Sequence, residues 1–196
     1  MPRIEHEKFY TAAYIKHGIT AKGLNWNSKL SQEKRFDQIL AALPKSLDDY
    51  TLADAGCGFG DLYLYILQKG LSPKEYIGIE FLEESCKIAQ MQSGCEILCA
   101  DICRDPIPQA DYYLCSGALN TLTPFETQLF IRRCFEASRK GFIFNILFGH
   151  NDSPNYNYFD KTDIEHLACE YSGATIKTSL GYLEDDITIA MMKEEA

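Results

Sequence analysis

The segment that decides the fold is TLADAGCGFGD, residues 51–61. Its first five residues are typical of a short buried strand, and a helical pattern from Asp61 to Lys69 follows its three glycines directly. Glycine tolerates positive φ and lets a ligand approach the backbone closely. A helix that begins behind such a turn favours a negative group at its N-terminus. The segment therefore predicts a strand, a ligand-binding turn and a helix.

The spacing of these glycines narrows the kind of turn. Gly56, Gly58 and Gly60 form a GxGxG pattern. A dinucleotide-binding turn has the pattern GxGxxG, and a phosphate-binding P-loop ends in Gly-Lys-Ser or Gly-Lys-Thr. The sequence matches neither of them.

Strands and helices alternate on both sides of this unit. We expect strands at 76–80, 96–100, 111–115 and 142–148, helices at 82–92, 123–140 and from 162, and two final strands at 175–180 and 187–192. This order predicts an α/β fold with a doubly wound, mostly parallel sheet. Ligands of such sheets bind at the carboxyl ends of the strands.

Polar side chains follow the expected strands where a ligand would lie. Glu80 ends the second strand, where a carboxylate can accept from both hydroxyls of a ribose. The pair Asp101-Ile102 follows the third strand, and Asp101 can accept from an adenine amino group. Ser116 follows the fourth strand. Their placement at successive strand ends predicts one common site.

With these motifs, the sequence over about residues 50–195 resembles the class I, Rossmann-like S-adenosylmethionine-dependent methyltransferases. Asp54-x-Gly56-x-Gly58-x-Gly60 matches the glycine motif of that family, Glu80 its ribose-binding acid and Asp101-Ile102 its adenine-flanking pair. The resemblance implies seven strands in the order 3-2-1-4-5-7-6 and an antiparallel terminal hairpin. It also implies methyl transfer from S-adenosylmethionine by in-line displacement.

The resemblance also implies a role for each matching residue. The backbone at Gly56 and Gly58 would line the methionine part of the cofactor, and Asp54 would hold the loop or the ammonium group. Gly60 would allow close packing of the next helix, and Cys57 would be a small filler in the loop. Phe81 would lie beside the adenine and Ser116 near the methionine end. No catalytic base is assigned.

The first 46 residues are expected to form a helical lid on the methyltransferase domain at 47–196. Helices are expected at 5–18 and 29–43, with Ser31 as the N-cap of the second. Several side chains of this segment either face the pocket or pack on the domain. Outside it, His150 is either a pocket residue or an exposed loop residue, and Tyr182 either reaches the acceptor or lies in a turn. The substrate or lid candidates are therefore Tyr10, Tyr14, Trp26, Gln32, Arg35, His150 and Tyr182.

Charge limits the class of acceptor. The net charge is −9, and it divides into +4 for residues 1–45 and −13 for residues 46–196. An acidic body disfavours nucleic acid as a partner, and residues 115–120 lack the Asn/Asp-Pro-Pro-Tyr motif of nucleic-acid base methylation. We therefore expect a small-molecule acceptor. The basic N-terminal segment either docks on the acidic body or covers an anionic ligand.

Composition also indicates the environment of the protein. The sequence has neither an apolar stretch long enough to span a bilayer nor an apolar signal-peptide core, so we expect a soluble, cytoplasmic protein without a membrane partner. The eight cysteines are then expected to be small buried residues and not metal ligands. Cys95, Cys99 and Cys103 share a parity that suits burial on one face of a strand. The sequence leaves the oligomeric state open.

Two alternatives to a methyltransferase stay open from the residues alone. An NAD(P)-dependent oxidoreductase explains the strand–glycine–helix unit and Glu80, but neither the GxGxG spacing nor Asp101. A non-catalytic cofactor-binding protein on the same fold explains all of these features.

Overall fold

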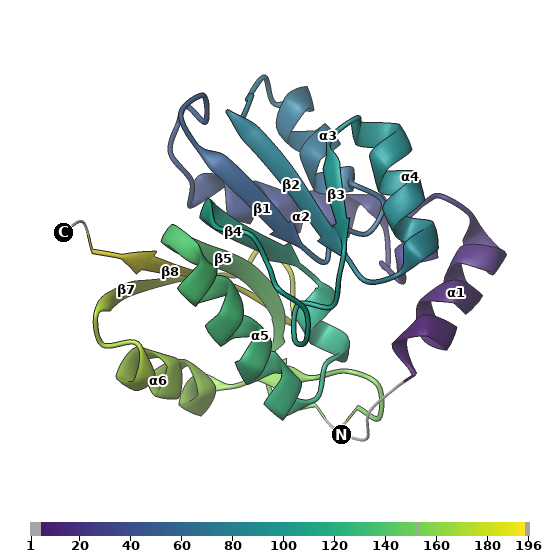
Figure 1. The fold of residues 1–196 in the computed structure, drawn as a ribbon. Coiled ribbons are helices and arrows are strands. Elements are labelled where there is room, and N and C mark those ends of the chain that lie inside the picture. The colour runs from purple at the N-terminus through teal and green to yellow at the C-terminus, as the bar shows by residue number, and fades with distance from the viewer. Residues whose placement is uncertain (1–4, 152, 195–196) are drawn as a thin grey trace.

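The computed structural model describes residues 5–151 and 153–194 (Figure 1). Residues 1–4, the start of the expected lid, and Asp152 of the loop after the fifth strand lie outside the described residues. In the part of the chain that is described, no helix is both long and apolar enough to cross a membrane.

The sheet has the strand order β3-β2-β1-β4-β5-β8-β7. The first five of its strands to appear along the chain are parallel, and β7 and β8 form an antiparallel hairpin on the edge beside β5. A two-residue strand, β6, pairs with β5 outside this path and raises the last two strand numbers by one. The predicted doubly wound sheet and its order are therefore confirmed. The bounds are Thr51–Ala55 for β1, Glu75–Glu80 for β2, Glu96–Cys99 for β3, Ala110–Ser116 for β4, Ser138–Phe148 for β5, Tyr158–Phe159 for β6, Ala174–Leu180 for β7 and Asp186–Lys193 for β8.

Helices cover both faces of the sheet (Figure 1). Apolar side chains of α2 and α3 pack on one face, and those of α5 and α6 pack on the other. The helix α4 lies against α3, β2 and β3, whereas α1 lies at the side of the molecule next to the short helix η1. The bounds are His6–His17 for α1, Ala21–Leu24 for η1, Lys29–Ala41 for α2, Asp61–Gln68 for α3, Glu83–Ser93 for α4, Ala118–Thr121 for η2, Pro124–Ala137 for α5 and Lys161–Glu170 for α6.

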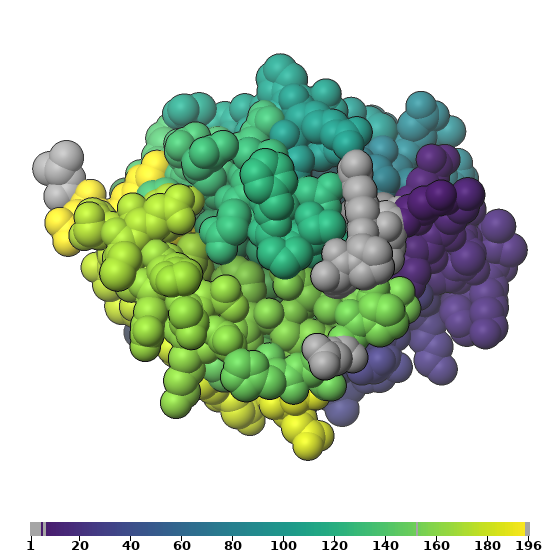
Figure 2. Space-filling model, turned by 90° about the horizontal axis from the view of Figure 1, so that it is seen from below, coloured from purple at the N-terminus to yellow at the C-terminus, as the bar shows by residue number. Residues whose placement is uncertain are grey.

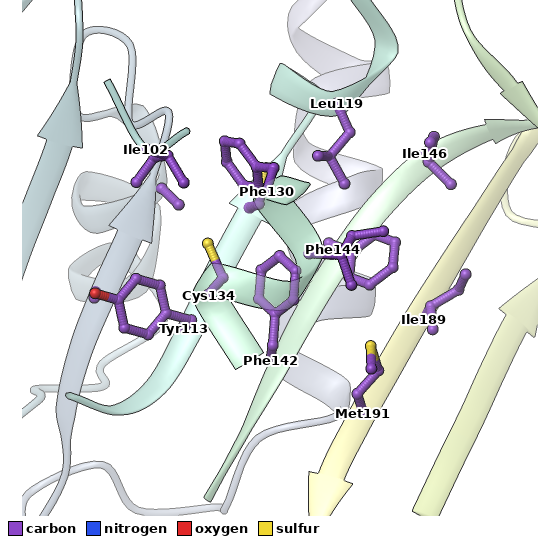
Figure 3. Close-up of a cluster of buried hydrophobic side chains, with 14 of the residues drawn as sticks. Ile102, Tyr113, Leu119, Phe130, Cys134, Phe142, Phe144, Ile146, Ile189 and Met191 are labelled. Atoms are coloured by element: carbon purple, nitrogen blue, oxygen red, sulfur yellow. The ribbon is translucent and has the colours of Figure 1, made fainter. Parts of the chain in front are cut away.

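The larger core cluster lies between the sheet and α5 (Figure 3). Phe142 and Phe144 of β5 stack with ring centroids 4.8 Å apart, and both side chains are fully buried. Burial of one such ring contributes about 1.5–3 kcal/mol. The core therefore fixes the central strands, whose carboxyl ends carry the expected site.

Three details of the helix ends differ from the sequence prediction. Ser28, and not Ser31, is the N-cap of α2, while Ser31 completes the capping box from the third position. Asp160 caps α6, two residues before the expected start at Thr162. The helix α5 ends at Ala137, before the expected end at Lys140, since β5 already begins at Ser138. Gly141 therefore lies within β5, where a Cβ atom would be only 2.6 Å from the carbonyl oxygen of Met191.

The expectation that all cysteines are buried is wrong for the group at 95–103 and for Cys169. Cys57, Cys86, Cys115 and Cys134 are buried, but Cys99 and Cys169 are exposed, and Cys95 and Cys103 are half-buried. The parity argument failed because β3 is a short strand at the sheet edge and ends at Cys99, so Cys103 lies beyond it in a loop.

Candidate functional site

The glycine turn lies at the carboxyl ends of β1 and β2, pressed between neighbouring segments. Gly56 and Gly58 have φ values of 77° and 57°. A Cβ atom on Gly56 would lie 2.6 Å from the Cβ atom of Ala118, and one on Gly58 would lie 2.8 Å from Leu24. Both positions therefore require glycine for conformation, and Gly56 also requires it for space, because the Cβ atom of Ala118 cannot move without its backbone.

Glu80 ties this turn to the end of β2. One carboxylate oxygen accepts from the backbone N–H of Gly58 at 3.0 Å, and the other accepts from the N–H groups of Phe81 and Leu82 at 2.9 and 3.1 Å. Burial raises the pKa of Glu80, and these three donors oppose the shift. The acid therefore holds the loop in place in addition to any contact with a ligand.

Asp54 is a second buried carboxyl group at the end of β1. Its side chain is 2% exposed, and the hydroxyl of Tyr76 donates to its Oδ2 atom. Burial raises the pKa of Asp54 to about 7, in part opposed by this hydrogen bond and supported by the nearby charges of Glu80 and Asp61. A cationic ligand beside Asp54 would relieve this unfavourable burial.

A cavity of about 590 Å³ extends from this turn. Nearly all of the residues predicted to bind the cofactor line it: Asp54, Gly56, Cys57, Gly58, Glu80, Phe81, Asp101, Ile102 and Ser116. Gly60 does not line it. It is the N-cap of α3 in a left-handed conformation, and its α-carbon faces Ala89 of α4. This agrees with the expectation that Gly60 allows close packing of the helix.

The N-terminal segment forms the opposite wall of this cavity. Tyr10, Trp26, Gln32 and Arg35 line it. The guanidinium of Arg35 stacks on Trp26 at 4.7 Å from the ring centroid, and its Nε atom donates to Asp186 at 2.7 Å. Both members of this ion pair are buried, at 8% and 4% exposed. The segment is therefore anchored to β8 by a buried ion pair.

The helix α1 contacts the segments that follow β4 and β5. Tyr10 and Thr121 of η2 join through their hydroxyl groups at 3.3 Å, and the ring of Phe9 lies 6.5 Å from that of Tyr156. Figure 2 shows side chains of the purple N-terminal segment beside those of the green loop that follows β5. Residues that are far apart in the sequence thus enclose one space.

Comparison with known proteins agrees with this architecture. Residues 52–141 match the profile of a methyltransferase domain family. The Mycobacterium tuberculosis protein Rv1506c, which bears the name of a methyltransferase, is 31% identical over 114 residues that span 54% of this chain and 68% of the relative. The chain belongs to the class I S-adenosylmethionine-dependent methyltransferases. The nicotinamide-dependent alternative is thereby decided against.

Solved structures of methyltransferases share the fold of this methyltransferase. Magnesium protoporphyrin IX methyltransferase from Synechocystis PCC 6803, solved with bound SAH, is 15% identical with a TM-score of 0.69 and covers 84% of both chains. A Haloferax volcanii protein in complex with the Trm112 methyltransferase activator is 12% identical, with a TM-score of 0.72 and 98% of both chains covered. Human N-acetylserotonin methyltransferase, solved with SAM, is 14% identical with a TM-score of 0.65 and covers 98% of this chain and 61% of that one.

The cavity of this methyltransferase fits a nucleoside-linked amino acid such as S-adenosylmethionine. Its volume lies in the range of small-molecule pockets, about 300–1,000 Å³. It offers carboxylates at Asp54, Glu80 and Asp101, and a buried amide nitrogen of Asn25 that has no hydrogen-bond partner among the described residues. These groups match the cations, hydroxyls and carboxylate of such a ligand.

Three of the predicted substrate or lid residues do not line this cavity. Tyr14 packs on Phe59 with ring centroids 5.9 Å apart. His150 lines a separate cavity of about 350 Å³, in which Tyr156 also takes part. The Tyr182 hydroxyl accepts from the Thr188 hydroxyl at 2.9 Å, which ties it to β8, and burial raises the pKa of Tyr182 to about 12.

Sequence reasoning missed several residues of the wall. Asn25 stands in a left-handed conformation with φ of 60°, and only its residue type gave a signal, because asparagine tolerates this conformation. Leu24, Thr121 and Tyr156 line the cavity because of tertiary packing, which no local sequence pattern predicts.

Proposed function

We propose that this methyltransferase transfers the methyl group of S-adenosylmethionine to a small-molecule acceptor that is enclosed between the N-terminal segment and the carboxyl ends of β4 and β5. The observation that carries the proposal is that one continuous cavity extends from the glycine turn past Tyr10 to Tyr156. Two structural neighbours have names that state small acceptors, magnesium protoporphyrin IX and N-acetylserotonin. In this reading, residues 1–46 act as a lid on the domain at 47–196.

At the cofactor end, we assign each polar group to a part of the ligand. Asp54 faces the ammonium group, Glu80 accepts from the ribose hydroxyls, and Asp101 accepts from the adenine amino group. Arg35 lies with its Nη1 atom toward Gly117, and the unpartnered amide of Asn25 lies in the same wall. These two donors suit the carboxylate of the methionine part.

The residues at the other end position the acceptor. When bound, the cofactor supplies a methyl group on a sulfonium, which is already an activated electrophile. The chain therefore has to align a nucleophile and exclude water. Burial raises the pKa of Tyr10 to about 12, so its hydroxyl stays protonated and serves to orient the acceptor.

The basic N-terminal segment does not by itself favour an anionic acceptor. Of its cations, Arg35 and Lys8 line the cavity, and each is paired with a carboxylate, Asp186 and Glu5 respectively. The sequence left two interpretations of this segment, docking on the acidic body or covering an anionic ligand. The ion pair between Arg35 and Asp186 supports the first of them.

Binding of the demethylated product S-adenosylhomocysteine tests the cofactor end. Gly56→Ala adds a methyl group 2.6 Å from the Cβ atom of Ala118 at a φ of 77° and should abolish measurable binding. Gly70→Ala is the matched control, because its φ is 74° and its surroundings are empty within 4 Å. Equal affinity of the two variants in calorimetry would refute the site.

Labelled cofactor tests the acceptor. Tritium in the methyl group is offered together with cell extract that has been divided by ultrafiltration into small-molecule and macromolecular fractions. Label in the small-molecule fraction supports the proposal, whereas label confined to RNA or protein contradicts it. The Glu80→Ala variant is the background control.

A further inference from the structure

Two thiols lie at the carboxyl ends of β2 and β3, next to Phe81, the residue that we expect beside the adenine. Cys86 belongs to the first turn of α4 and is buried, and Cys99 is the last residue of β3 and is exposed. In the sheet, Cys99 pairs in register with Glu80 of β2. Figure 1 shows α4 and β3 side by side at this edge.

The two sulfur atoms contact the carbonyls of consecutive residues. Cys86 donates to the carbonyl oxygen of Glu80 at 3.2 Å, and Cys99 donates to that of Phe81 at 3.9 Å. Burial raises the pKa of Cys86, and a hydrogen bond with the Cys99 side chain raises it further. Both thiols therefore lie against the same short stretch of backbone, the carbonyls of residues 80 and 81, from two elements that pack on each other.

Cys103 and Cys95 are equally near to Cys99 in the sequence, and both are directed elsewhere. The sulfur of Cys103 donates to the carbonyl oxygen of Glu126 at 3.6 Å, and Cys95 precedes β3. The sulfur of Cys95 donates to the carbonyl oxygen of Ser93 at 3.7 Å, and its neighbour is Tyr63. Neither is thus placed to compete for Cys99. Cys169, the other exposed cysteine, lies on α6 on the opposite face of the sheet.

We propose that Cys86 and Cys99 form an oxidative modification site, at which a hydroperoxide converts the two thiols into a disulfide. The exposed Cys99 reacts first: its sulfur attacks one peroxide oxygen, an S–O bond forms and the O–O bond breaks, and the other oxygen leaves with the thiol proton, as water from hydrogen peroxide or as an alcohol from an organic hydroperoxide. The sulfur of Cys86 then attacks that of Cys99, an S–S bond forms, the S–O bond breaks, and the hydroxyl leaves as water with the thiol proton. The two thiols lose two electrons, and the peroxide gains them.

The disulfide should also weaken cofactor binding, a consequence that rests on the proposed function. The bond removes both S–H contacts with the carbonyls of residues 80 and 81 and draws α4 toward β3. The N–H groups of Phe81 and Leu82 in this segment donate to the carboxylate of Glu80. Loss of one hydrogen bond to a charged group corresponds to about tenfold weaker binding.

The modification is tested first, by intact mass and peptide mapping of the full chain after treatment with hydrogen peroxide and alkylation. The wild type and Cys169→Ser should lose the mass of two hydrogen atoms and show a peptide linked through Cys86 and Cys99. Cys86→Ser and Cys99→Ser should not form this link. The serine hydroxyl at position 86 can still donate to the Glu80 carbonyl, and thermal unfolding verifies that the variant is folded.

A wild type that only gains oxygen, or a disulfide of Cys99 that persists in Cys86→Ser, would overturn the site. The second measurement is the affinity for S-adenosylhomocysteine before oxidation, after it, and after reduction with dithiothreitol. We expect about tenfold weaker binding in the oxidised wild type, reversed by the reductant and absent in Cys99→Ser. Unchanged affinity of the linked protein refutes the effect on the cofactor, whereas failure of the reduced protein to bind refutes the proposed function and leaves the mass result standing.

Discussion

Replacement of Asp54 by asparagine should stabilise the free protein and weaken its hold on the cofactor. The asparagine oxygen can still accept from the Tyr76 hydroxyl, so the substitution chiefly removes a titratable group from a buried position. The pKa of Asp54 is about 7 in the folded chain against an ordinary value of 3.8. Because the folded value is the higher one, the contribution to stability is complete below pH 3.8 and is lost as the pH rises through 7.

The size of this pKa shift sets the expected change in the free energy of unfolding. A change from 3.8 to about 7 corresponds to about 4 kcal/mol of lost stability at high pH, and more than half of it is lost between pH 5 and pH 8. Asp54→Asn does not titrate, so its advantage over the wild type should grow by that amount between these two pH values. Asp49→Asn removes a carboxylate from an exposed position and serves as the control.

Urea denaturation at pH 5 and pH 8 measures the difference. Calorimetry with S-adenosylhomocysteine at pH 5.5 and pH 8 measures the other half of the prediction: wild-type affinity should fall by up to about 30-fold at the lower pH, because most of Asp54 is then protonated. The affinity of Asp54→Asn should be low and nearly independent of pH. If the stabilities of wild type and variant stay parallel across this range, the carboxyl group is not desolvated as described and the reasoning is refuted.

Further substitutions test the anchoring of the cavity walls. Gly117→Ala places a methyl group 2.9 Å from Trp26 at a φ of 84° and should weaken cofactor binding, whereas Gly181→Ala, at a φ of 82° in open space, should carry the same backbone strain and leave binding intact in calorimetry. Arg35→Met leaves Asp186 as an uncompensated buried charge and should destabilise the fold by about 3–5 kcal/mol, and addition of Asp186→Asn should recover much of this loss in urea denaturation. If the two single effects simply add, the pair is not coupled. Glu80→Ala leaves the N–H groups of Gly58, Phe81 and Leu82 without their acceptor, whereas Glu80→Gln keeps one acceptor oxygen. The alanine variant should therefore have the lower thermal midpoint of unfolding. Equal midpoints would mean that the Glu80 side chain does not hold the turn.

The sheet and the cofactor end of the cavity were predictable because they follow from local patterns. Parallel strands meet with their carboxyl ends at one edge, so Glu80, Asp101 and Ser116 had to come together once the strands were placed. The capping box at Thr123 and Glu126 likewise fixed the start of α5 from adjacent residues.

The N-terminal wall was not predictable in the same way. Arg35 and Asp186 are 151 positions apart, and Tyr10 and Thr121 are 111 apart. Of the described side chains of α1, only that of Ala13 is buried, while Ile15 is 78% exposed, so the helix has no apolar face from which its packing could be inferred. A two-residue strand such as β6 leaves no periodic signal either.

The buried acids predict that a cationic ligand stabilises the site. Asp54 and Glu80 both have raised pKa values because the protein removes them from water. The free energy lost in folding is recovered when a positive group arrives beside the carboxylates, since ligand binding and folding are linked through the same ionisation. The rise in thermal midpoint caused by S-adenosylhomocysteine should therefore be larger at pH 8 than at pH 6 in the wild type. Asp54→Asn should abolish most of this difference, because its site enters the folded state already neutral.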